Sequence, residues 1–204
     1  MDKSKYLDIL DGYIENKKRK KHSISTANFM EKYAPLIGVD PEKSYIAGLL
    51  HDIGKYQDKD RIVEMAESYD ARGIEHINYF DFKKEHPFLL HGVASAEILL
   101  STGIINDNEL VLAISHHTTG GADISRLAKY TFISDFCEPM RKYKESKKVR
   151  NVLIKKKDFE RAYFLSYYYL IESLIERKME ICIESIEGYN DSLIILKNKE
   201  NSKQ

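Results

Sequence analysis

A chain of 204 residues with 43% hydrophobic and 31% charged side chains is long enough to bury one sizeable core. Its basic and acidic residues number 32 each, and this balance favours neither a nucleic-acid partner nor a membrane. The N-terminus leads into no long apolar segment, and the two cysteines form no Cys-x-x-Cys motif. We therefore expect one cytoplasmic domain over residues 1–196, monomeric or homodimeric, followed by a polar tail at 197–204.

Helical periodicity dominates the chain, and no alternating strand pattern of useful length appears. We expect the second helix to stop before Pro35, Asp40 to cap the third helix and Asp123 to start the seventh. The stretch 74–85, which contains Tyr79, has no clear period and is interpreted as a loop. The predicted fold class is all-α, with helices near residues 6–14, 22–33, 41–52, 61–69, 87–103, 107–116, 123–136, 159–179 and from 185 onward.

The stretch 47–55 is the centre of the functional prediction. An apolar run there ends in His51 and Asp52 side by side, followed by Gly54 and Lys55. A His-Asp pair at a helix end is by itself usually a solvated cap. Four other helical segments, however, each place an ionisable side chain within or beside apolar residues, and burial of such groups is costly unless they are paired or bind metal. The complete set is His22, His51, Asp52, His91, His117 and Asp135.

Four imidazoles and two carboxylates suit two transition-metal ions that share one carboxylate. The set contains no thiolate, which argues against a structural zinc site. The order His, His-Asp, His, His, Asp resembles the HD-domain metal-dependent phosphohydrolases, a superfamily with a helical-bundle fold. The resemblance is closer to the bacterial YqeK family, the symmetrical bis(5'-nucleosyl)-tetraphosphatases. It covers about residues 19–187 and is carried by Arg19-x-x-His22, Gly48-Leu49-Leu50-His51-Asp52-x-x-Lys55, Leu89-Leu90-His91-Gly92, His117-Thr118-Thr119-Gly120 and Asp135-Phe136-x-Glu138-Pro139-x-Arg141.

The resemblance implies a dinuclear metal site and a substrate. The metal would be iron, although nitrogen and oxygen ligands also accept manganese, cobalt, nickel or zinc. A metal-bridging hydroxide would attack a dinucleoside tetraphosphate, and diadenosine tetraphosphate plus water would give two ADP. One ion would be held by His22, His51, Asp52 and Asp135, and the second by His91 and His117, with Asp52 bridging both.

The resemblance also implies residues that meet the substrate. Lys55, which is assigned to catalysis together with Asp52, would contact phosphate. Arg141 would also contact phosphate, as would Arg19, which lies one helical turn before His22. A tight turn would bind phosphate oxygens through its hydroxyl and backbone N–H groups. This turn comprises Thr118, Thr119 and Gly120. The simpler alternatives are a solvated lysine, a surface arginine and an ordinary turn.

Four further alternatives stay open. His116 is adjacent to His117 and could replace it as a ligand, and the stretch 74–85 either lines a nucleotide pocket or merely covers the core. The chain could instead hydrolyse another nucleotide, such as a deoxynucleotide or a guanosine polyphosphate. A catalytically inactive metal-bound regulatory module is the last possibility, against which the complete ligand series argues.

Overall fold

The computed structural model describes residues 2–78 and 80–202, and within them every regular element is a helix. The predicted all-α class is therefore confirmed. The elements are α1 (Lys3–Tyr13), α2 (Lys17–Ile37), α3 (Pro41–Leu50), α4 (Lys59–Ala71), α5 (Phe80–Glu85), the 3-10 turn η1 (Pro87–Leu89), α6 (His91–Ser101), α7 (Asn108–Ser115), α8 (Arg126–Cys137), α9 (Lys144–Ile154), α10 (Phe159–Glu176) and α11 (Ile183–Asn201).

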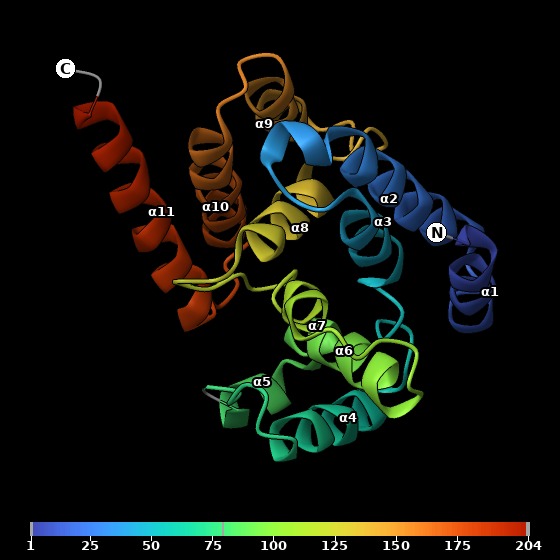
Figure 1. Ribbon diagram of the computed structural model, residues 1–204. Helices are drawn as coiled ribbons and strands as arrows, with labels where there is room; N and C mark the ends of the chain where they lie inside the picture. The colour runs from blue at the N-terminus through green and yellow to red at the C-terminus, as the bar shows by residue number, and fades with distance from the viewer. Residues whose placement is uncertain (1, 79, 203–204) are drawn as a thin grey trace.

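Helix α8 lies at the centre of the bundle (Figure 1), because it contacts α2, α3, α7, α9 and α10. Helices α2 and α3 pack against each other on one side of α8, and α9 and α10 pack together on another. Helices α4, α6 and α7 form a further packed group, while α11 packs on α10. None of the helices in the described part of the chain is both long and apolar enough to cross a membrane.

The predicted end of α2 and the predicted start of α8 differ from the structure. Helix α2 continues through Pro35 to Ile37 and ends at Gly38, which adopts the left-handed conformation with φ +79°. Proline removes only one hydrogen bond near the end of a helix, and burial of Ile37 opposes that cost. Helix α8 is capped by Ser125, whose hydroxyl accepts from the Ala128 N–H, and not by Asp123.

The remaining differences concern helices that the sequence prediction omitted or cut short. Helix α9 was not predicted, although Val149, Val152 and Leu153 form a buried face among its lysines. Helix α5 occupies part of the expected loop 74–85, whose Tyr79 lies outside the described residues. Helix α11 extends into the expected polar tail as far as Asn201. Residues 203–204 of that tail lie outside the described residues.

Candidate metal centre

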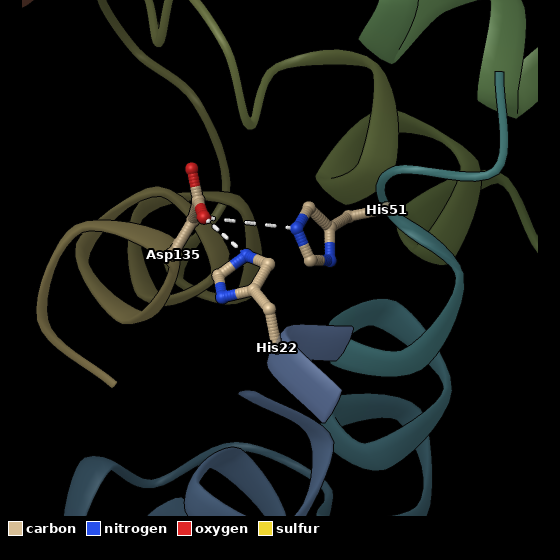
Figure 2. A group of neighbouring side chains, drawn as sticks. All are labelled: His22, His51 and Asp135. Carbon is tan, nitrogen blue, oxygen red and sulfur yellow. Dashed lines mark ion pairs between the residues drawn. The ribbon is translucent and has the colours of Figure 1, made fainter. Parts of the chain in front are cut away.

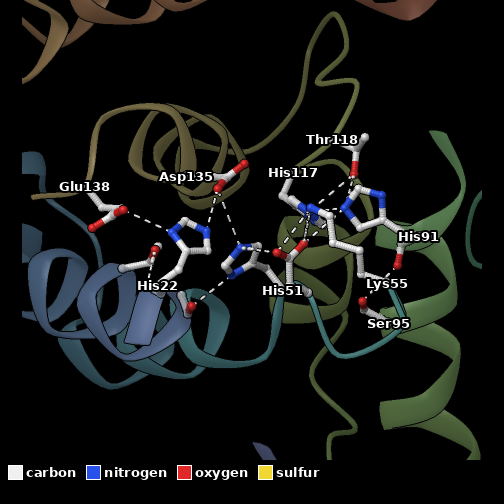
Figure 3. Close-up of polar contacts among 12 residues, drawn as sticks. His22, His51, Lys55, His91, Ser95, His117, Thr118, Asp135 and Glu138 are labelled. Carbon is white, nitrogen blue, oxygen red and sulfur yellow. Dashed lines mark hydrogen bonds and ion pairs between the residues drawn. The ribbon is translucent and has the colours of Figure 1, made fainter. Parts of the chain in front are cut away.

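Five segments bring the six predicted ligands together, and Figure 3 labels five of these residues. His22 lies within α2, whereas His51 and Asp52 directly follow the last residue of α3. His91 is the first residue of α6, His117 follows α7, and Asp135 lies in the last turn of α8. Five of the six are buried, with Asp135 half-buried, so the cluster lies inside the bundle.

Close backbone contacts at glycines allow these segments to approach. A Cβ atom on Gly48 would lie 2.9 Å from the backbone of Ala27, so α3 packs directly on α2. A Cβ on Gly54 would lie 2.6 Å from the Ser95 nitrogen and 2.9 Å from the His91 carbonyl oxygen. One on Gly92 would lie 2.6 Å from the carbonyl oxygen of Ser115 in α7. The sequence therefore places glycine at three of the contacts between ligand-bearing segments.

His22, His51 and Asp135 form one half of the cluster (Figure 2). The Oδ1 atom of Asp135 lies 2.9 Å from Nε2 of His22 and 3.7 Å from Nε2 of His51. The Nε2 atom of His51 is fully buried and has no hydrogen-bond partner among the described residues. An unsatisfied polar atom at this depth is costly, and a metal ion would satisfy it.

Asp52 faces both halves of the cluster. Its Oδ1 atom lies 3.1 Å from Nε2 of His91 and 3.4 Å from Nε2 of His117. Its Oδ2 atom lies 3.6 Å from Nε2 of His51. One carboxylate therefore reaches three of the four imidazoles, with its two oxygens turned towards different ones.

Hydrogen bonds to the backbone set the tautomer of three histidines. Nδ1 of His51, His91 and His117 donates to the carbonyl oxygen three residues earlier, at 2.9, 2.5 and 2.8 Å. A carbonyl only accepts, so the proton is on Nδ1 and the lone pair of Nε2 faces the cluster. Burial lowers the pKa of His91 and of His117, which keeps both rings neutral. Their Nε2 atoms lie 3.0 Å apart, an arrangement that a bound cation would stabilise.

The carboxylates keep their charge. Burial alone would raise the pKa of Asp52, but neighbouring groups, including the Lys55 ammonium that donates to both of its oxygens, hold it well below its usual range. Burial alone would also raise the pKa of Asp135, but the Arg141 guanidinium and the histidines hold that pKa well below its usual range. Neutral rings at His91 and His117 and ionised carboxylates at Asp52 and Asp135 are the protonation states that bind a metal ion, so these donors fit one.

Glu138 is a supporting residue whose role the sequence interpretation missed. It is fully buried, and its carboxylate lies 3.0 Å from Nδ1 of His22. The carboxylate also accepts hydrogen bonds from the Ser25 hydroxyl and from the Met140 N–H, the latter at 2.6 Å. These bonds turn Nε2 of His22 towards Asp135. The signal available in the sequence was its position three residues after Asp135, because a carboxylate commonly orients a metal-binding histidine.

Three of the predicted substrate residues lie at the cluster. Nζ of Lys55 donates to both oxygens of Asp52, at 2.9 and 3.2 Å. Arg141 donates through Nη2 to Oδ1 of Asp135 at 2.7 Å and through Nε to the Asp135 carbonyl oxygen at 2.9 Å. The Thr118 hydroxyl lies 3.3 Å from Nε2 of both His91 and His117.

The structure places the other predicted substrate residues elsewhere. Thr119 and Gly120 line a separate cavity of about 160 Å³ together with His116 and Glu75. The Gly120 N–H already donates to the His116 carbonyl oxygen at 2.8 Å. Nε2 of His116 lies 2.6 Å from Oε1 of Glu75, and its Nδ1 donates to the Gly120 carbonyl oxygen. His116 therefore stabilises the turn from outside the cluster, whereas the side chain of its neighbour His117 lies in the cluster.

Arg19 lies beside the Tyr56 hydroxyl. Burial raises the pKa of Tyr56, whereas the charge of Arg19 and its hydrogen bond lower that pKa. Arg19 is half-exposed at the edge of the site, one helical turn from His22.

The geometry agrees with the comparison to known families. The family model of the HD domain matches residues 19–140, a range that contains all six clustered side chains. The chain belongs to the HD domain family. Structural similarity supports this family assignment. A structure described as a "predicted HD superfamily hydrolase involved in NAD metabolism" from Clostridium acetobutylicum superposes on this chain with a TM-score of 0.82. That chain is 27% identical, and the match covers 95% of this HD domain chain and 97% of the other.

Two relatives of this HD domain chain carry the name "Bis(5'-nucleosyl)-tetraphosphatase, symmetrical". The protein from Staphylococcus aureus is 34% identical over 124 residues, which are 61% of this chain and 60% of the relative. The protein from Halalkalibacterium halodurans is 27% identical over 194 residues, which are 95% of this chain and 98% of the relative. The chain thus spans less than two thirds of the first relative and nearly all of the second.

Adjacent histidines in the HD domain should respond differently to substitution. We expect His117→Ala to lose about half of the bound metal, because its Nε2 faces Asp52 and His91. His116→Ala should keep its metal content near normal, since His116 pairs with Glu75 outside the cluster. Metal quantification on both variants checks the assignment, and the reverse pattern would make His116 the ligand.

Metal binding to the HD domain should release a proton from His22. Burial lowers the pKa of this ring, but Asp135 and Glu138 outweigh burial and raise its pKa to about 9. The metal-free ring is therefore cationic at pH 7, and a metal ion at Nε2 must displace its proton. Metal affinity should rise by up to roughly tenfold per pH unit between pH 7 and pH 9 and then level off.

Calorimetry in two buffers with different ionisation enthalpies measures that released proton. Glu138→Gln is the matched variant, because it keeps an acceptor for Nδ1 but removes the charge that raises the pKa of His22. We expect less proton release at pH 8 in this variant. An unchanged number of protons would show that His22 is not the source.

Proposed function

We propose that this chain hydrolyses dinucleoside tetraphosphates symmetrically, so that diadenosine tetraphosphate and water give two ADP. The observation that carries the proposal is a buried cluster of imidazole and carboxylate donors in which Nε2 of His51 has no partner among the described residues. Two relatives that carry the name of this activity support the choice of substrate.

The proposed cofactors are two metal ions, with iron as the first candidate and manganese, cobalt, nickel or zinc as metals that the same donors accept. When bound, they would supply a water of lowered pKa as nucleophile and neutralise charge on the phosphoryl oxygens. One ion would be held by His22, His51, Asp52 and Asp135, and the other by His91, His117 and Asp52.

Residues of the chain itself would orient the phosphates. Lys55 keeps about a quarter of its side chain exposed beside Asp52, so its ammonium can meet a phosphate oxygen. Arg141 uses Nε and Nη2 on Asp135, which leaves Nη1 to donate to the substrate. Thr118 adds a hydroxyl donor next to the His91–His117 pair. These donors would stabilise the charge that develops as the bond to the leaving nucleoside diphosphate breaks.

A cavity of about 630 Å³ opens from this cluster between α8, α9 and α10. Its lining includes His117, Asp135 and Arg141 at the inner end. Phe136 and Tyr169 form part of its wall, with parallel rings 6.5 Å apart at an interplanar angle of 6°. Phosphate-binding groups at one end and aromatic rings along a wall suit a nucleoside diphosphate, so this cavity would take one half of the substrate.

Product analysis tests the proposal. Protein purified without oxygen is assayed for metal and then incubated with diadenosine tetraphosphate, and the products are separated by chromatography. Two ADP for each substrate consumed is the expected result. ATP plus AMP, or no turnover by metal-loaded protein, contradicts the proposal. Faster turnover of a deoxynucleotide or a guanosine polyphosphate would assign the site to another nucleotide.

A further inference from the structure

A second cleft lies away from the cavity that would take the first nucleoside. It has a volume of about 600 Å³ and is lined by Gly12, Tyr13, Glu15, Asn16 and Tyr56. These residues come from the end of α1, the segment before α2 and the turn after α3. The first cavity is bounded by α8, α9 and α10, and Figure 1 shows α1 and α10 on opposite sides of α3 and α8.

Two short paths connect this cleft to the metal cluster. Asn16, Arg19 and His22 are spaced three residues apart, so they follow one face along α2 over roughly 9 Å. On the other path, Tyr56 is next to Lys55, whose ammonium contacts Asp52. Arg19 therefore lies along the first path and Lys55 along the second, so each path has one cation between the cleft and a predicted metal ligand.

The charges favour a nucleoside in the cleft and phosphates outside it. Among the described residues that line the cleft there is one carboxylate, Glu15, and no cation. A carboxylate repels phosphate but accepts hydrogen bonds from ribose hydroxyls or a base amino group. Arg19 and Lys55 lie between the cleft and the cluster, where a diphosphate joined to that nucleoside would run.

The two tyrosines provide ring faces for a base. Tyr56 keeps 43% of its surface exposed, and Tyr13 is half-buried against the core. Of the aromatic contacts found within residues 2–78 and 80–202, none joins Tyr13 to Tyr56, so the rings do not stack on each other. Every base has a face that can stack on such a ring.

We propose that the cleft between Tyr13 and Tyr56 is the subsite for the second nucleoside of the dinucleoside tetraphosphate, an inference that rests on the proposed function. Arg19 and Lys55 hold the diphosphate that connects this nucleoside to the metal cluster. The middle of the tetraphosphate then lies at the metals, with one nucleoside in each pocket. This placement explains in physical terms why hydrolysis would be symmetrical.

Kinetics on two substrates test the second subsite. Diadenosine tetraphosphate fills both pockets, whereas adenosine 5'-tetraphosphate has one nucleoside, which the stacked Phe136–Tyr169 wall would take. We expect Tyr56→Ala and Tyr13→Ala to lower kcat/KM for the dinucleotide by roughly tenfold or more, mainly through KM. Neither substitution should change kcat/KM for the mononucleotide. Tyr13→Phe should keep the dinucleotide rate, because the ring and not the hydroxyl stacks.

Tyr168→Ala is the matched control, because Tyr168 lies on α10 outside both pockets and is also 43% exposed. Metal content and thermal unfolding of each variant show whether the fold is intact. Equal losses on both substrates, or no loss on the dinucleotide, overturn the second subsite. If the wild-type protein fails to turn over the dinucleotide at all, the proposed function fails instead.

Discussion

Asp52→Ala is expected to bind neither metal ion and to lose nearly all hydrolysis of diadenosine tetraphosphate. The two oxygens of Asp52 face His91 and His117 on one side and His51 on the other, so its removal takes a ligand from both proposed ions. Bound metal ions contribute several kcal/mol to charge stabilisation, and the expected loss is on the order of a thousandfold or more.

Metal quantification and initial rates measure this effect, with thermal unfolding to confirm that the variant folds. Asp58→Ala is the control, because Asp58 is an exposed aspartate only six residues away whose side chain makes no capping hydrogen bond. It should keep its metal content. Two ions still bound to Asp52→Ala would exclude a bridging role for this carboxylate.

Gly54→Ala is expected to reduce the free energy of unfolding by roughly 1–3 kcal/mol and to reduce metal content as well. Its Cβ would meet the Ser95 nitrogen and the His91 carbonyl oxygen, which are backbone atoms that cannot rotate away. The Gly54 N–H also donates to the Ser95 hydroxyl at 2.9 Å. The turn that carries His51 and Asp52 must therefore move away from α6, and the distance from Asp52 to His91 must grow.

Urea unfolding and metal analysis check this expectation. Gly12→Ala is the matched control for stability, because Gly12 lies within α1 and a Cβ added there would meet no atom within 4 Å. Alanine favours a helix over glycine by up to about 1 kcal/mol, so this variant should be at least as stable as the wild type. Unchanged stability in both variants would show that the contact between the turn and α6 tolerates a methyl group.

Much of the architecture follows from local sequence. Asp40 caps α3 as predicted, and Asp107 caps α7 in the same way, because a side chain that accepts from an N–H three residues later acts within one turn. Errors arose where local signals compete with packing, as at Pro35, or where lysines surround a narrow apolar stripe, as in α9. The six predicted ligands were likewise chosen from local features, namely residue type and position beside apolar runs.

Only the tertiary structure decided which of these groups meet and which way they face. Glu138 contacts His22 across 116 residues of sequence, and Arg141 points back to Asp135 instead of lying free on the surface. Thr118 turns towards the cluster while Thr119 turns away, a choice that residue type does not encode. The physical reason is that helix formation depends on neighbours in the chain, whereas the direction of a side chain in a buried site depends on how distant helices pack.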